Sequence, residues 1–299
     1  MIAVHEATGL QAWDVDPGIV YSINPVGLDD AGNVWFATGN HTPGSWLHSF
    51  TATGDFRHRS GIAAQWERYL APTWFYGEMA TNAGYYGGMY RFLTDGTEVA
   101  FVGLPQYERW APSPWNDRWV AFARTISVVN RTTHAVEFSV AIPDYDWTGY
   151  SMNQAPVVVN DIAFVTNGGR LIGIDLVQRI PVINKSIQAQ GQVSTNGQQL
   201  FVAAAGMLST RDMQGNVVRN YAIANTSLLA PFIVTRSHAI ARTARGTTAV
   251  FDLRTHELVT ELPTAGEMAL ADGVLYVGNA TGVLEAFSFP FVLHQDGFE

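Results

Sequence analysis

The stretch EMALADGVLYVG at residues 267–278 consists of two short apolar runs separated by an Asp-Gly pair. An Asp-Gly pair between apolar runs is a strong signal for a β-hairpin. The opening stretch IAVHEATGLQAWDV at residues 2–15 has the same form around Thr8 and Gly9. The chain between them repeats both kinds of hairpin in the opposite order. We therefore expect the end of the chain to begin a sheet that the start completes, so that the two ends close a ring.

Two classes of turn alternate along the chain. The first class lies at residues 30–33, 116–117, 160–161, 196–197, 236–237 and 272–273, with a degenerate copy near Gly77. The second class lies at residues 8–9, 53–54, 95–96, 132–134, 177–178, 214–215 and 255–256. Turns of one class recur roughly every forty residues, and a four-stranded unit with this period is typical of a β-propeller.

These turns predict an all-β fold: a seven-bladed β-propeller of four-stranded antiparallel blades, closed by the N- and C-terminal strands. No Pro/Ser-rich or charged spacer interrupts the series, so we expect a single domain over residues 1–290 and a polar tail at residues 291–299. Two stretches, 2–7 and 283–289, compete for the third strand of the closing blade. The pattern leaves this choice open.

Composition excludes several classes of partner. The 299 residues carry a formal net charge of -9 and a single lysine, Lys185, so we expect no nucleic-acid partner. The absence of cysteine excludes disulfides and thiolate metal sites. No apolar run approaches the roughly 18 residues that cross a bilayer, so we expect no membrane span. We also expect a monomer.

The two ends of the chain bear on its location. Met1 is followed at once by a strand-like segment, without the basic and apolar regions of a signal peptide. The ending Asp-Gly-Phe-Glu at residues 296–299 is similar to one found on some exported bacterial proteins. We therefore expect an extracellular or periplasmic location rather than a cytoplasmic one, with a signal peptide that this sequence does not contain.

The opening segment also resembles a known repeat. Residues 2–13 have the order strand, polar residue, Ala-Thr-Gly, and a strand carrying Trp13, which is similar to the quinoprotein-type (PQQ-like) propeller repeat. Residues 171–175 and 250–258 are similar, weaker copies. Propellers of this superfamily hold ligands from quinone cofactors to partner proteins, so the resemblance implies the fold and leaves the function open.

The same resemblance argues against a quinone cofactor. Quinoprotein dehydrogenases have a disulfide between adjacent cysteines over the cofactor, and this chain has no cysteine. Their propellers have eight units, whereas the turns here predict seven. We therefore expect no PQQ and no other cofactor, and no ligand motif indicates a structural cation.

Long connections gather on one face of the predicted propeller. In an antiparallel blade both turn classes lie on one face, and the remaining connections lie on the other. Five of these connections are long, at residues 39–46, 57–73, 81–89, 104–114 and 142–154. Long connections commonly carry binding sites. The predicted ligand-binding residues in or beside them are Trp66, Trp74, Tyr85, Tyr86, Trp110, Tyr145, Trp147 and Tyr150. The alternative, left open, is that these rings pack between blades.

Catalytic candidates are few. Asp144 and Asp146 form a carboxylate pair that could act as acid and base on a glycosidic bond, could bind a hard cation, or could simply form a turn. The turn is the commoner role of such residues. His41 and Arg109 lie in the long connections and join them as candidates. His134 and His256 occupy equivalent short turns, and we expect both to be structural.

Two functions remain after these exclusions. The first is a non-catalytic binding or assembly module that presents the aromatic long-connection face to a protein or carbohydrate ligand. The alternative is a carbohydrate-active enzyme, a polysaccharide lyase or glycoside hydrolase, with its site at the central opening of the same face. The absence of a specific catalytic motif favours the binding module.

Overall fold

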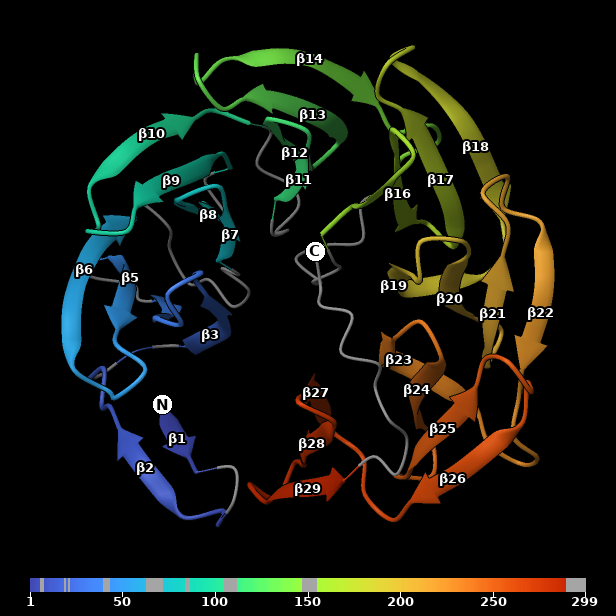
Figure 1. The fold of residues 1–299 in the computed structure, drawn as a ribbon. Helices are drawn as coiled ribbons and strands as arrows, with labels where there is room; N and C mark the ends of the chain where they lie inside the picture. The colour runs from blue at the N-terminus through green and yellow to red at the C-terminus, as the bar shows by residue number, and fades with distance from the viewer. Residues whose placement is uncertain are drawn as a thin grey trace. The chain divides into compact units, whose positions relative to one another are not determined.

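The computed structural model describes residues 1–5, 8–18, 20, 22–39, 44–62, 72–83, 87–104, 112–146 and 155–288. Every regular element among these residues is a β-strand (Figure 1). No helix long and apolar enough to cross a membrane occurs in this described part of the chain.

Three four-stranded antiparallel sheets, blades 1 to 3, follow an N-terminal hairpin. The hairpin consists of β1 (Ile2–Val4) and β2 (Gln11–Asp14). Blade 1 contains β3 (Ser22–Leu28), β4 (Val34–Gly39), β5 (Ser45–Phe50) and β6 (Phe56–Ile62). Blade 2 contains β7 (Thr73–Phe75), β8 (Glu78–Asn82), β9 (Met89–Leu93) and β10 (Glu98–Val102). Blade 3 contains β11 (Ser113–Trp115), β12 (Arg118–Phe122), β13 (Thr125–Asn130) and β14 (Val136–Ala141).

Blades 4 to 6 repeat this order, and blade 7 has three strands. Blade 4 contains β15 (Val157–Val159), β16 (Ile162–Asn167), β17 (Arg170–Asp175) and β18 (Ile180–Ser186). Blade 5 contains β19 (Ala189–Thr195), β20 (Leu200–Ala204), β21 (Met207–Arg211) and β22 (Val217–Tyr221). Blade 6 contains β23 (Leu228–Val234), β24 (His238–Thr243), β25 (Thr248–Asp252) and β26 (Leu258–Leu262). Blade 7 contains β27 (Glu267–Ala271), β28 (Val274–Gly278) and β29 (Leu284–Ser288).

The prediction of an all-β, seven-bladed propeller is confirmed. Turns of the first predicted class join the first and second strands of each blade. Turns of the second class join the third and fourth strands of blades 1 to 6, and the turn at residues 8–9 joins β1 and β2. In the turn at residues 272–273, Asp272 and Gly273 have φ of 47° and 78°. Two consecutive left-handed residues match the twist of a two-residue hairpin, which explains why the Asp-Gly pair was a reliable signal.

The strands at the two ends settle one choice that the sequence left open. β29 pairs with β28, with Ala286 opposite Tyr276, so the 283–289 stretch supplies the third strand of blade 7. β1 pairs with β2 in a hairpin of its own, with Ala3 opposite Trp13. The proposal that β2 supplies the fourth strand of blade 7 remains a prediction.

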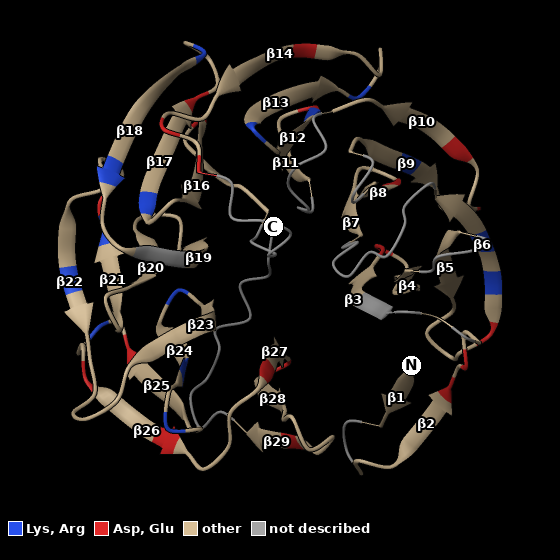
Figure 2. Cartoon of the chain, turned by 180° about the vertical axis from the view of Figure 1, so that it is seen from behind, with Lys and Arg blue, Asp and Glu red and all other residues tan. Residues whose placement is uncertain are grey.

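Burial follows the position of a strand within its blade. In blades 1 to 6 the second and third strands are buried on both faces, as in β12 and β13, whereas outer strands such as β22 are largely exposed. In blade 7, β28 and β29 are buried only at alternate positions or less. The outer strands β6, β10, β14, β18, β22 and β26 each carry at least one charged residue (Figure 2). Because the inner strands are buried and the outer strands carry charged residues, a chain with 47% hydrophobic and only 14% charged residues can bury most of its apolar side chains.

Residue contacts divide the chain into two compact units. The first contains residues 1–168 and 172–184, and the second contains residues 169–171 and 185–299. The single domain over residues 1–290 therefore stays a prediction, and the tail at 291–299 lies outside the described residues.

The apolar core of each unit lies between successive blades. In the first unit, Trp35 of blade 1 and Phe92 of blade 2 share one buried cluster. In the second unit, Phe201 of blade 5 and Phe232 of blade 6 share another. Within each unit, these neighbouring sheets bury their apolar faces against each other, which is how a blade that cannot bury both faces alone becomes stable.

Some predicted connections were placed wrongly at their edges. Residues 57–62 belong to strand β6, residues 45–46 to β5, and residues 81–82 to β8. The polar Arg-His-Arg sequence at residues 57–59 lies inside β6, although such a sequence is unusual in a strand. An outer strand has solvent along one edge, so it can carry polar side chains where an inner strand cannot.

Candidate functional site

Two of the eight predicted ligand-binding aromatics lie in the described part of the chain. Trp74 packs against the apolar cluster between blades 1 and 2. Tyr145 packs against the cluster between blades 3 and 4, and the Arg124 guanidinium lies 5.7 Å from its ring centre. Both rings therefore have a packing role. The other predicted residues, Trp66, Tyr85, Tyr86, Trp110, Trp147, Tyr150, His41 and Arg109, lie outside the described residues.

The candidate acids Asp144 and Asp146 are anchored to blade 4. The Asn184 side-chain amide donates a hydrogen bond to Asp144 Oδ2 at 3.1 Å. The Asp146 backbone N–H donates to Asn167 Oδ1 at 2.8 Å, and Asn167 Nδ2 donates to the Asp146 carbonyl at 2.8 Å. These contacts hold the chain where it enters blade 4. Over the described residues, no group of three or more His, Asp or Glu side chains is placed to hold a metal ion.

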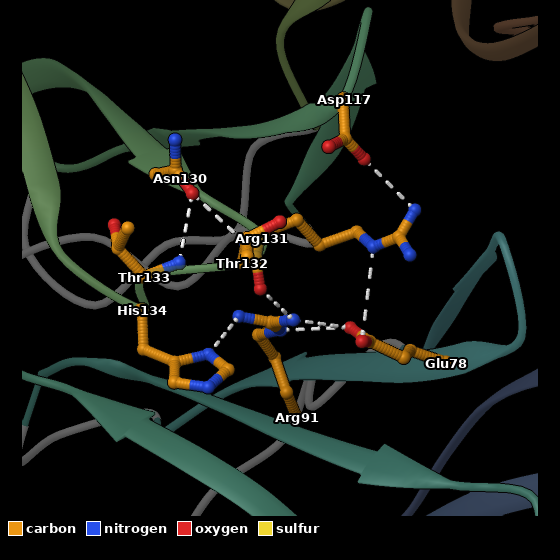
Figure 3. Close-up of polar contacts among 8 residues, drawn as sticks. All are labelled: Glu78, Arg91, Asp117, Asn130, Arg131, Thr132, Thr133 and His134. Carbon is orange, nitrogen blue, oxygen red and sulfur yellow. Dashed lines mark hydrogen bonds and ion pairs between the residues drawn. The ribbon is translucent and has the colours of Figure 1, made fainter.

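A charge cluster centred on the buried Arg91 joins blades 2 and 3 on the short-turn face (Figure 3). Arg91 on β9 is fully buried and donates through Nε and one terminal nitrogen to Glu78 Oε2, at 2.8 and 2.6 Å. The same guanidinium donates to His134 Nδ1 at 2.8 Å and to the Arg131 carbonyl at 2.6 Å. Arg91 of blade 2 is thus fixed to the turn at residues 130–134 of blade 3. We call Glu78, Arg91, Arg131 and His134 the Arg91 clamp.

Further contacts complete the Arg91 clamp. The Arg131 guanidinium lies 3.7 Å from Glu78 Oε1 and 2.9 Å from Asp117 Oδ1. Asn130 Oδ1 accepts hydrogen bonds from the backbone N–H groups of Thr132 and Thr133, which fixes the turn (Figure 3). The Arg91 donors are engaged by the protein itself, so the cluster has a structural role.

The second turn histidine makes a similar contact in the second unit. His256 Nδ1 lies 2.9 Å from the Tyr221 hydroxyl of the preceding blade. His134 and His256 both have left-handed φ, at 60° and 66°. Both histidines hold a turn against the previous blade, in agreement with the structural role predicted for them.

The N-terminal hairpin docks on blade 1 through Trp13. Its indole stacks on Phe50 with ring centres 6.5 Å apart, and its Nε1 donates to the Ala52 carbonyl at 3.0 Å. Beside this contact lies a groove of about 470 Å³. One wall is formed by the chain that follows β2, namely Val15, Asp16 and Pro17. The other is formed by blade 1 through His48, Phe50, Phe56 and Arg59. We call this the Phe50 groove.

Aromatic rings of blade 1 stand nearly parallel where His48 and Phe50 line the Phe50 groove. The Phe36 ring lies 5.0 Å from His48 and 5.7 Å from Phe50, with interplanar angles of 8° and 10°. His48 is buried, and its Nε2 lies 3.0 Å from the Thr38 hydroxyl. Burial, with a smaller contribution from the Arg59 charge, lowers the pKa of His48 to about 4. The imidazole is therefore neutral at pH 7.

Sequence reasoning missed this groove although a signal was present. Trp46, His48 and Phe50 alternate along β5, so their rings share one face of the strand. Arg59 on the neighbouring strand β6 lies over the Trp46 ring, 4.6 Å from its centre. The wall formed by residues 15–17 could not be foreseen, because it depends on how the hairpin docks.

Comparisons with known proteins identify the fold. The chain matches BamB from Moraxella catarrhalis with a TM-score of 0.74 and 13% identity, covering 96% of this chain and 91% of BamB. The chain has a β-propeller fold. It also matches the C-terminal WD40 domain of Sif2 with a TM-score of 0.70 and 11% identity, over 90% of this chain and 82% of that domain. The computationally designed Ika8 protein matches with a TM-score of 0.56 and 13% identity, over 91% of this chain and 98% of Ika8.

No protein-family model and no curated protein sequence matches the chain. The likeness to BamB and to the WD40 domain is thus one of fold, at identities of 13% and 11%. The quinoprotein-type repeat remains a resemblance of residues 2–13 and their weaker copies.

Proposed function

We propose that the protein is a binding scaffold for a protein partner, which contacts the long-connection face of blades 1 to 4. One observation carries the proposal. Six of the predicted aromatic residues fall between the described strands, in the connections at 63–71, 84–86, 105–111 and 147–154. Tryptophan and tyrosine are enriched among the residues that dominate protein–protein binding energy.

The opposite face supports this choice. On that face, His134 and His256 in the short turns contact side chains of the preceding blade, in the Arg91 clamp and in the Tyr221–His256 contact. The carbohydrate-active alternative needs two carboxylates across a sugar bond. Asp144 accepts a hydrogen bond from Asn184, and the Asp146 backbone is paired with Asn167, so these contacts favour turn anchoring over catalysis. As part of the proposal, the scaffold works outside the cytoplasm, as a monomer and without PQQ.

The double variant Trp110→Ala/Trp147→Ala tests the proposed face. We expect it to weaken partner binding by about 30-fold or more, because truncation of one hot-spot residue costs about 2 kcal/mol or more. The measurement is crosslinking and quantitative mass spectrometry of proteins captured from a lysate of the source organism. We expect the melting temperature to stay within about 2 °C of wild type, since under this proposal both rings contact the partner and do not pack in the core.

The matched control is Tyr76→Ala, which removes a ring that is 67% exposed in a short turn of blade 2. This control should capture the same proteins as wild type. Equal capture by the double variant would contradict the proposal. A large loss of melting temperature would show that Trp110 and Trp147 are packing residues instead.

A further inference from the structure

We propose that the Phe50 groove binds a free aromatic α-amino acid, a small molecule with one planar ring, one ammonium and one carboxylate. This inference goes beyond the proposed scaffold function, since it concerns a different part of blade 1 and a different class of ligand.

The size and the walls of the groove suit one planar ring. Its volume of about 470 Å³ is in the range typical of small-molecule sites. His48 and Phe50 line it with their nearly parallel rings, and Pro17 also belongs to the lining. Phe56, which is 60% exposed, meets Phe50 edge-on with ring centres 5.7 Å apart. A ring that enters the groove therefore finds an apolar, aromatic surface on blade 1, and the lining also contains the ring of Pro17.

The two charges that line the groove have opposite signs and come from the two segments that form it. Asp16 belongs to the chain that follows β2, and its Oδ1 accepts a hydrogen bond from the Gly18 N–H at 2.9 Å. Arg59 belongs to β6 of blade 1, where stacking on the Trp46 ring orients its guanidinium. Neither forms an ion pair with another described residue.

A zwitterion complements both charges at once. Its ammonium can pair with the Asp16 carboxylate and its carboxylate with the Arg59 guanidinium, and such charge-assisted contacts are stronger than neutral ones. The neutral His48 adds no third charge. An aromatic compound with a single charge would leave either Asp16 or Arg59 without a partner, so the groove should prefer the zwitterion.

Calorimetric titration of the full chain with L-phenylalanine tests this inference. We expect saturable binding of one molecule per chain. N-acetyl-L-phenylalaninamide, which keeps the ring and lacks both charges, should bind about tenfold more weakly or worse. The tripeptide Gly-Phe-Gly distinguishes a free amino acid from a phenylalanine within a peptide, because the terminal charges of the tripeptide lie on its glycines. It should also bind about tenfold more weakly or worse if the ligand is the free amino acid.

Two variants locate the binding to the groove. Arg59→Gln and Asp16→Asn should each lower the affinity for L-phenylalanine by about tenfold or more. The matched control is Arg179→Gln, which removes an exposed arginine that lies 4.5 Å from the Phe138 ring centre and does not line the groove. This control should bind as wild type does.

Three outcomes would overturn the inference. The first is no saturable binding of phenylalanine, tyrosine or tryptophan up to about 10 mM, a concentration at which binding would be weak even for a ligand of this size. The second is that the uncharged analogue or the tripeptide binds as tightly as L-phenylalanine. The third is that both groove variants bind L-phenylalanine as tightly as wild type does. Trp110→Ala/Trp147→Ala should leave amino-acid binding intact. A failure of the scaffold proposal is therefore distinguishable from a failure of this one.

Discussion

Replacing Glu78 by Gln is expected to lower the free energy of unfolding by about 3–5 kcal/mol, the usual cost of leaving a buried charge without its partner. The Arg91 guanidinium is fully buried, and its ion pair with Glu78 Oε2 measures 2.6 Å. A neutral amide at position 78 can still accept a hydrogen bond, but it cannot compensate the charge. Arg131, which also lies near Glu78, loses the same partner.

Urea denaturation of wild type and Glu78→Gln measures this effect. Glu137→Gln is the matched control because Glu137 also forms a carboxylate–arginine pair, with Arg118 at 2.8 Å, but on a partly exposed outer strand. Its loss should be less than about 1 kcal/mol, as for other exposed pairs. A Glu78→Gln variant that loses no more than Glu137→Gln would show that the Arg91 clamp does not stabilise the junction of blades 2 and 3.

Acid should destabilise the protein through His48. The pKa of His48 falls from an ordinary 6.5 to about 4 on folding, so the unfolded chain binds the proton more tightly. Stability that depends on the neutral ring is therefore complete above pH 6.5 and decreases as the pH falls toward 4. Between pH 7 and pH 5 this linkage costs about 2 kcal/mol.

Denaturation curves at pH 7 and pH 5, for wild type and His48→Gln, isolate that contribution. The variant keeps a polar side chain next to Thr38 and removes the titrating ring, so its stability should fall by about 2 kcal/mol less than that of wild type over this interval. His5→Gln, in an exposed N-terminal segment, is the control and should lose as much as wild type. An equal loss in wild type and His48→Gln would mean that burial of His48 does not set the acid response.

Turn chemistry explains why the fold could be predicted from sequence. Pairs such as Asp272 and Gly273 adopt left-handed backbone that few other residues tolerate, so each turn marks a hairpin from its own two residues. The edges of the outer strands could not be placed in the same way. The Arg57, His58 and Arg59 side chains of β6 are held by contacts with other strands and with the turn of blade 2, which no local pattern records.

The sites show the same division between local and long-range information. The alternation of Trp46, His48 and Phe50 in the sequence places their rings on one face of a strand, so it predicts the part of the groove that β5 lines. The Arg91 clamp could not be found in this way. Arg91 stands among apolar residues of β9, while its contact His134 is 43 residues further along the chain. Only the packing of blade 2 on blade 3 brings these groups together.

Ring closure by the two ends of the chain is the feature on which the seventh blade depends, and introduced cysteines test it most directly. The chain has no cysteine of its own. Ala12→Cys in β2 is combined in turn with Glu285→Cys, Ala286→Cys or Phe287→Cys in β29. Neighbouring strands lie about 5 Å apart, and a disulfide needs Cα atoms within about 7 Å.

The control pair is Ile2→Cys/Asp14→Cys, because Ile2 and Asp14 lie opposite each other in the β1–β2 hairpin. Mass spectrometry after mild oxidation should show an intramolecular disulfide in this control and in at least one of the three test pairs. If the control pair forms its disulfide and none of the three test pairs does, β2 is not the fourth strand of blade 7 and closure by the two ends is wrong.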